Sequence, residues 1–404
     1  MASANSSRLP LRFWIAALVA FVNAVGFTLI IPLIYPYAVE FGLSDFQASL
    51  LTTAYAAAQF IATPILGRLS DRIGRKPLLI ISLLGTVAAN LMAGLAPAAW
   101  MLFVARVLDG ITGGNTSIAQ AIIGDITTPD QRARAYGIFG AVFRLGFVVG
   151  PPLSYVAQLV PPLPGFTSLG MGFLFSAAIA LFAALLCLVL LPETLENCCD
   201  SFRISWRDFG FGRLARSATD GRFGRIFWLT FFSGFTFTIF TFAFQPFFLN
   251  VLGQDARNLA IMFAAVGIIG FVTQVFALEP LRRRFRLVHI LAGALAARGV
   301  LFLLMPAFPN IVAFVAFAVV FSAVNSFPMP LIDALLSLNS GPREQGEVLG
   351  LNASYLSISN AIGPATAGLL VSVSYSFPFW IAGALTLLTA WFALSLKGRG
   401  KVMG

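Results

Sequence analysis

The sequence predicts an all-α membrane protein with about twelve transmembrane helices, built as two pseudo-symmetric six-helix bundles. Hydrophobic residues make up 58% of the 404-residue chain, charged residues make up only 10%, and the mean hydropathy is +0.88. A soluble domain carries about 25% charged residues, so this chain has too few polar side chains to cover a water-facing surface. Many apolar runs reach the length of about 20 residues that a spanning helix needs. They also lack the period-2 alternation of barrel strands.

Twelve apolar segments are expected to cross the bilayer, and a polar stretch divides them into two sets of six. They lie near residues 13–38, 46–66, 77–96, 99–121, 132–158, 169–191, 224–249, 256–279, 286–306, 309–337, 347–372 and 376–396. The first run is too long for the apolar region of a signal peptide, so we expect it to be retained. The polar stretch is too rich in charges to lie in hydrocarbon. The expected organisation is therefore an N-terminal bundle over 1–192, a cytoplasmic linker over 193–222 and a C-terminal bundle over 223–404.

Basic residues set the expected orientation. The net charge is +10 and the isoelectric point about 10.2, a balance that nucleic-acid binding could also explain. However, arginine and lysine gather in loops of one parity, such as 68–76 and 282–286, and only Arg257 falls in a loop of the other parity. This asymmetry favours a membrane protein with both termini in the cytoplasm. We therefore expect a multi-pass protein of the plasma membrane, which in bacteria is the inner membrane, and no nucleic-acid partner.

The loop between the second and third spans carries an ordered pattern. Residues 67–77 read GRLSDRIGRKP, in which glycines permit a tight turn and close backbone approach. This segment closely resembles the loop signature of the major facilitator superfamily. The resemblance implies that the loop acts as a conformational latch and that its residues gate transport without touching the substrate. The candidate gating residues of this loop are Gly67, Asp71, Arg72, Gly74 and Arg75.

Other motifs of the first half resemble the drug–proton antiporter branch of that superfamily, which includes tetracycline exporters. They are 106–114 (RVLDGITGG), 124–126 (GDI), 132–134 (RAR), 146–152 (GFVVGPP) and 191–195 (LPETL). In that branch the glycine–proline motif of the fifth span marks antiporters. Small glycines allow helices to approach closely, and proline bends a helix. The further gating candidates from these motifs are Asp125, Arg134, Gly146, Gly150 and Pro151.

The second half matches the branch only loosely. Residues 277–284 (ALEPLRRR) are a degenerate copy of the loop signature. Gly363-Pro364 in the eleventh span corresponds to Gly150-Pro151 in the fifth. Matched helix breaks of this kind indicate a transporter built from internal repeats.

The first span departs from the branch at the position of its usual acid. That acid lies about nine residues before a proline, and here the position is Asn23, before Pro32. An amide does not carry a proton as a carboxylate does. Two unusual charges occur elsewhere, Asp109 in the fourth span and Arg144 in the fifth. Because isolated charges in a membrane cost about 2.5–3.5 kcal/mol each, we expect a buried cluster of Asp109, Arg144 and Arg106.

Two interpretations of this cluster stay open. It could be a permanent salt bridge that fixes two helices, or Asp109 could exchange a proton or release an arginine to an anionic substrate. Two arginines against one acid would leave the site positive, which favours an anionic, zwitterionic or neutral amphipathic substrate. The expected cavity residues are polar or charged side chains on otherwise apolar spans. Each of these side chains could instead form a contact between helices. They are Asn23, Gln59, Asn115, Gln245, Arg298 and Asn325.

The function that this pattern favours is proton-coupled efflux of a small amphipathic solute or drug. An uncoupled facilitator or importer of a small organic solute is the alternative, and a non-transporting sensor or a lipid scramblase is a third. The sequence has no phosphate-binding loop of Gly-x-x-x-x-Gly-Lys-Ser/Thr type and no catalytic constellation. The three cysteines and the single His289 offer no metal-ligand spacing. We therefore expect no enzyme activity, cofactor or metal, with protons, a small solute and lipid as the partners of a monomer.

Overall fold

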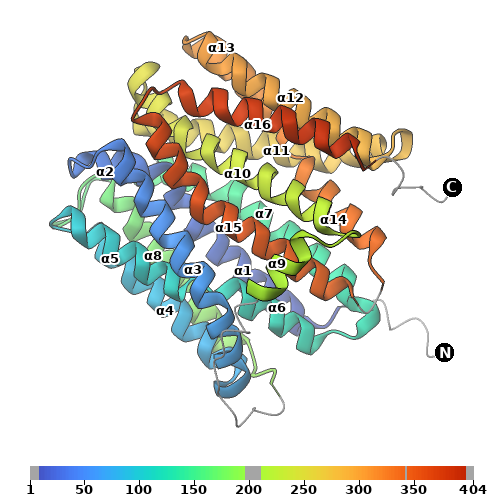
Figure 1. Cartoon of the computed structure of the whole chain (residues 1–404). Coiled ribbons are helices and arrows are strands. Elements are labelled where there is room, and N and C mark those ends of the chain that lie inside the picture. The colour runs from blue at the N-terminus through green and yellow to red at the C-terminus, as the bar shows by residue number, and fades with distance from the viewer. Residues whose placement is uncertain (1–8, 196–210, 342–343, 397–404) are drawn as a thin grey trace. The chain divides into compact units, whose positions relative to one another are not determined.

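The computed structural model describes residues 9–195, 211–341 and 344–396, and every regular element among them is a helix (Figure 1). The elements of the first half are α1 (Leu11–Ile30), the 3-10 turn η1 (Ile31–Leu33), α2 (Ile34–Glu40), α3 (Asp45–Ile73), α4 (Arg75–Gly94), α5 (Ala99–Thr112), α6 (Asn115–Ile126), α7 (Pro129–Leu159) and α8 (Gly170–Leu190). Those of the second half are α9 (Phe211–Ala218), α10 (Gly224–Pro246), the π-helix η3 (Phe247–Val251), α11 (Ala256–Arg284), α12 (Leu287–Ala307), α13 (Ile311–Asn325), α14 (Pro328–Asn339), α15 (Gln345–Val371) and α16 (Phe377–Leu394).

Ten segments of the described chain are long and apolar enough to cross a membrane. Two of the twelve expected spans are not among them. Residues 99–121 were expected as one span but lie on two helices, α5 and α6. Residues 347–372 lie largely on α15, which has 27 residues but carries polar side chains such as Asn352, Ser357 and Asn360. Twelve spans therefore remain a prediction.

The break between α5 and α6 falls at Gly113 and Gly114, where low helix propensity makes an interruption inexpensive. Side chains from two other helices satisfy backbone carbonyls at this break. The amide of Gln59 on α3 donates to the carbonyl oxygen of Gly113 at 2.8 Å. The hydroxyl of Ser82 on α4 donates to the backbone carbonyl oxygen of Thr112. The break is therefore a specific, hydrogen-bonded feature.

The helices form two compact units, the first with residues 9–37 and 57–195 and the second with residues 38–56 and the described residues from 211 onwards. The same pairs of helices pack in both units. In the first, α1 packs on α7 and α8, and α4 packs on α8 and α5. In the second, α10 packs on α15 and α16, and α12 packs on α16 and α13. A repeated packing scheme is the structural counterpart of the internal repeat expected from the sequence.

The Gly-Pro segments occupy equivalent places in these packing schemes. A Cβ added to Gly150 on α7 would overlap Thr28 of α1, and one added to Gly363 on α15 would overlap Thr238 of α10. The hydroxyl of Thr28 donates to the carbonyl of Gly146 at 2.7 Å, and that of Thr238 to the carbonyl of Ser359 at 3.2 Å. In each unit, a threonine therefore contacts its partner helix one turn before the Gly-Pro pair.

Candidate functional site

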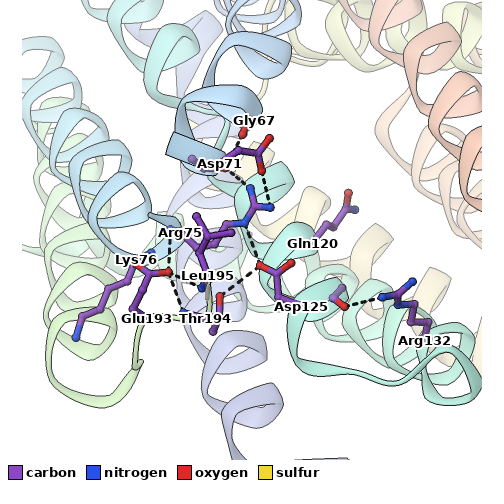
Figure 2. Close-up of polar contacts among 12 residues, drawn as sticks. Gly67, Asp71, Arg75, Lys76, Gln120, Asp125, Arg132, Glu193, Thr194 and Leu195 are labelled. Carbon is purple, nitrogen blue, oxygen red and sulfur yellow. Dashed lines mark hydrogen bonds and ion pairs between the residues drawn. The ribbon is translucent and has the colours of Figure 1, made fainter. Parts of the chain in front are cut away.

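Arg75 is the centre of a charged network at one end of the first unit (Figure 2). It is the first residue of α4 and is only 9% exposed. Its guanidinium contacts Asp71 of α3 at 2.6 Å and Asp125 of α6 at 3.0 Å. It also donates to the hydroxyl of Ser70. Because one arginine contacts two carboxylates that come from different helices, it ties the ends of α3, α4 and α6 together.

Glu193, just after α8, caps the start of α4. Its carboxylate accepts hydrogen bonds from the backbone N–H of Arg75 at 3.0 Å and of Lys76 at 3.1 Å. It also accepts from the backbone N–H of Thr194 and Leu195, at 2.8 and 2.9 Å. Burial alone would raise the pKa of this carboxyl group, but the four backbone hydrogen bonds lower it below its ordinary value. The charged form is therefore favoured, and it satisfies N–H groups that a helix start leaves unpaired.

Asp125 links the two halves of this network. Its Oδ2 atom accepts from Arg75 and lies 3.5 Å from the hydroxyl of Thr194, which donates to it. The chain end of α8 is thereby joined to α6 as well as to α4. The ends of α3, α4, α6 and α8 therefore meet at this network of charges.

The turn between α3 and α4 is shorter than the loop at 67–77 that the sequence predicts. Helix α3 continues through Ile73, and Gly74 alone separates it from α4. Gly74 has φ of 108°, and a Cβ there would lie 2.6 Å from the carboxylate of Glu193, so both backbone and space require glycine. Gly67 differs, because a Cβ there would meet nothing within 4 Å.

The remaining gating candidates lie on α3 and α7. Arg72 occurs in the last turn of α3, and Arg134 is exposed on α7. Gly146, Gly150 and Pro151 lie on α7, where both glycines face α1. A Cβ at Gly146 would come within 2.6 Å of the Ala24 Cβ.

A buried ion pair lies within the first unit. Arg106 and Asp109, one turn apart on α5, are 3% and 4% exposed, and the guanidinium lies 2.8 Å from the carboxylate. Thr86 of α4 hydrogen-bonds to the same carboxylate. The guanidinium also lies over the ring of Phe173, 5.9 Å from its centroid. The pair therefore holds a titratable acid in an apolar setting, with one cation beside it.

Arg144 does not complete the expected three-residue cluster. In the part of the chain that the structure describes, no ion pair joins Arg144 to Asp109. The physical reason is the packing of α7, whose Gly146 and Gly150 face α1, whereas Asp109 on α5 faces α4. Two residues along a helix turn a side chain by about 200°, so Arg144 projects away from the α1 contact. It is half-buried.

The expected cavity residues form separate polar contacts. Asn115 donates to Asn23 at 3.2 Å, and these two amides line a cavity of about 10 Å³ in the first unit, a volume about sufficient for one water molecule. Gln59 binds the carbonyl at the α5–α6 break. In the second unit Arg298 donates to Asn325 at 3.2 Å, and Gln245 is buried with its Oε1 atom without a hydrogen-bond partner.

Sequence reasoning missed two residues of these sites. Glu193 was recognised only as part of a motif after the sixth span, and its distance of 118 positions from Arg75 hid the contact. A carboxylate in a fixed motif beside a span end was the available signal. Thr28 carried no signal, because a threonine in an apolar helix is ordinary.

Comparison with known proteins identifies the family. The family model described as Major Facilitator Superfamily matches residues 16–297 and 226–401. The chain belongs to the major facilitator superfamily. It is therefore an integral, multi-pass membrane protein that transports small-molecule substrates and is not an enzyme.

Several superfamily relatives cover nearly the whole chain. Tetracycline resistance protein, class C, of Escherichia coli is 30% identical over 92% of this chain and 93% of its own length. Multidrug resistance protein 1 of Bacillus subtilis is 29% identical over 92% of this chain and 94% of its own. The crystal structure of the nucleoside transporter NupG shares the fold, with a TM-score of 0.75 and 14% identity over 96% of this chain and 100% of that one.

Proposed function

We propose that this protein exports a small amphipathic solute or drug in exchange for protons, by alternating access of its two bundles. Superfamily membership supports solute transport, and relatives named for multidrug and tetracycline resistance support export. The observation that carries the proton coupling is the buried pair of Arg106 and Asp109. An ionisable group within a spanning segment is by default a candidate for function.

Proton exchange at Asp109 would change this pair directly. The charged carboxylate holds Arg106 at 2.8 Å. Once protonated, it would keep a hydrogen bond from the charged guanidinium but lose the attraction between two opposite charges, so the attraction between these two positions of α5 would fall. Exchange of a proton would thus alter the packing of α5 on α4, where Thr86 contacts the same carboxylate. Arg144 is not required for this step.

The network around Arg75 is proposed to act as the latch. Its members lie at the ends of α3, α4, α6 and α8, so a change in the packing of these helices would strain contacts of 2.6 to 3.1 Å. Ion pairs of this kind stabilise one arrangement without resisting a large movement once broken. We propose that they hold one state of the transport cycle and open in another.

The proposed membrane arrangement follows the basic loops. We propose twelve spans in the plasma membrane or bacterial inner membrane, with both termini and the linker at 193–222 in the cytoplasm. Residues 196–210 of this linker lie outside the residues that the structure describes. The Arg75 network and the exposed Arg282 and Arg283, which contact Glu279, would then face the cytoplasm. We further propose that the protein works as a monomer.

An uncoupled facilitator is the second candidate, and one observation favours it. Asn23, where the antiporter branch usually has an acid, forms a neutral hydrogen bond with Asn115. If Asp109 only holds helices together, this protein would have no proton carrier in the first unit. A facilitator would move solute down its gradient without moving protons.

Transport in proteoliposomes that contain a trapped pH dye tests the proposal. Tetracycline is applied as the probe to wild type, Asp109→Asn and the surface control Glu344→Gln. We expect probe flux with a pH change in wild type and in the control, and loss of the pH change in Asp109→Asn. An unchanged pH signal in Asp109→Asn would exclude the proton role. Flux without any pH signal in wild type would establish the facilitator, and lipid movement without solute flux a scramblase.

A further inference from the structure

Arg298 is a second buried arginine, located on α12 of the second unit. It is 2% exposed and is the largest of the fully buried side chains in the described chain. One terminal nitrogen, Nη1, donates to Asn325 at 3.2 Å. The other, Nη2, lies 3.1 to 3.3 Å from the hydroxyl of Thr236 and from the carbonyl and hydroxyl of Ser233. All of these acceptors are neutral.

No carboxylate balances this charge. Among the residues that the structure describes, Arg298 forms no salt bridge, and its Nε atom is buried without a hydrogen-bond acceptor. A guanidinium has five N–H donors and cannot lose its charge in a protein. A buried, uncompensated ion carries a desolvation penalty of several kcal/mol. This differs from Arg106, whose charge Asp109 neutralises within the same helix.

The internal repeat shows which residue of the first half corresponds to Arg298. Helices α4 and α5 begin at Arg75 and Ala99, and α12 and α13 begin at Leu287 and Ile311, with the same spacing within each pair. Position 298 thus corresponds to position 86 in the first half, where Thr86 contacts an acid. The second half therefore has a cation at the position where the first half has a neutral hydroxyl and an acid in contact with it.

We propose that Arg298 binds the anionic group of the transported solute, a monovalent carboxylate on an aromatic or otherwise apolar body. This inference rests on the proposed export of amphipathic solutes and names their class. The carboxylate would accept the unused Nε–H and supply the missing counter-charge. The ring of Phe302 lies 5.9 Å from the guanidinium, stacks with Phe240 and lies 5.4 Å from the ring of Phe321, so a cluster of buried aromatic rings adjoins the proposed site of the solute's apolar body.

Asn325 is the least buried member of the hydrogen-bonded group around Arg298. It is half-buried, whereas Arg298, Ser233 and Thr236 are buried. Its Oδ1 atom is already within hydrogen-bond distance of the guanidinium. Asn325→Asp would replace the side-chain amide with a carboxylate of the same shape. The variant would place a permanent anion where we expect the solute's anion to act.

Binding to the purified full-length protein tests the proposal with three matched probes: naphthoate, naphthamide and naphthylmethylammonium. They share an aromatic body and differ in charge. Wild type is expected to bind naphthoate about 10- to 100-fold more tightly than naphthamide, the range for hydrogen bonds to a charged group. Arg298→Gln should remove this preference, and Arg298→Lys should keep part of it. Asn325→Asp should remove it too, with a melting temperature equal to or above that of wild type.

The Arg298 and Asn325 variants and a titration with chloride distinguish the possible explanations of naphthoate binding. If Arg298→Gln lost naphthoate binding because it misfolded, a well-folded Asn325→Asp protein would still bind naphthoate. Loss of naphthoate binding in both variants therefore supports the proposal. Equal naphthoate binding in wild type, Arg298→Gln and Asn325→Asp would overturn the proposal. Titration with chloride against gluconate tests an inorganic source of the anion. Arg298-dependent stabilisation by chloride without an effect of naphthoate would also overturn it. Proton coupling is read separately in Asp109→Asn, so failure of the proposed function is distinguishable from failure of this inference.

Discussion

Four glycines of α7 provide a controlled test of close helix packing. A Cβ at Gly146 would lie 2.6 Å from the Ala24 Cβ, and one at Gly150 would lie 2.7 Å from the backbone nitrogen of Leu29. Cβ atoms at Gly137 and Gly140 would meet nothing within 4 Å. The same substitution in one helix therefore separates the effect of packing from that of helix propensity.

The expected magnitudes have opposite signs. Gly140→Ala should be neutral or stabilise the protein by up to about 1 kcal/mol, because alanine favours the helix. Gly150→Ala needs α1 and α7 to separate by about 1 Å to restore ordinary contact, and overpacking of this kind costs about 1–3 kcal/mol. Its net effect on the free energy of unfolding should be a loss of up to about 2 kcal/mol, since the gain in propensity of about 1 kcal/mol offsets part of the overpacking cost.

Thermal unfolding in detergent, followed by tryptophan fluorescence, measures the difference between these variants. Gly140→Ala should melt at or above the wild-type temperature, and Gly150→Ala and Gly146→Ala should melt below it. If Gly150→Ala proved as stable as Gly140→Ala, the close contact of α7 with α1 would not exist as described. Transport assays on the same samples would show whether this contact also limits turnover.

Three further predictions concern the charged sites. Gly74→Ala should lose about 1–3 kcal/mol, because its φ of 108° strains any other residue, and an unaltered melting temperature would contradict this. The pKa of Glu193 is lowered from 4.5, so its stabilisation is present above that pH and is lost as pH falls through the lowered value. Glu193→Gln should therefore show a smaller loss of melting temperature on acidification than wild type, and equal losses would contradict the assignment. Asp109→Leu should lose about 3–5 kcal/mol, since it removes the carboxylate that balances the buried charge of Arg106, and Arg106→Met added to it should recover part of that loss. Strictly additive losses in this double-mutant cycle would contradict the ion pair.

Composition and periodicity were sufficient to predict the helical membrane fold, because apolar length and charge scarcity are properties of the chain itself. The matched Gly-Pro positions predicted the repeat, and packing of α7 on α1 and of α15 on α10 agrees with it. The split of residues 99–121 was not predicted, because the apolar run continues through Gly113 and Gly114. Its stabilising contact, from Gln59, comes from another helix.

Among the site residues, spacing along the sequence predicted a contact within one helix but not the contacts between helices. The pairing of Arg106 with Asp109 follows from three-residue spacing on one helix. The expected contact of Arg144 depended on which faces of α5 and α7 meet, which spacing along the chain does not determine. The contact of Glu193 with α4 likewise depends on the packing of α8 against α4.

The ratio of protons to solute moved by reconstituted protein tests the central claim most directly. Proton and tetracycline fluxes would be recorded together for wild type, Asp109→Asn, Asn23→Asp and the double variant. Proton exchange at Asp109 predicts a fixed non-zero ratio in wild type, a ratio of zero in Asp109→Asn, and recovery only where Asn23→Asp supplies another acid. The same non-zero ratio in wild type and Asp109→Asn would contradict the account.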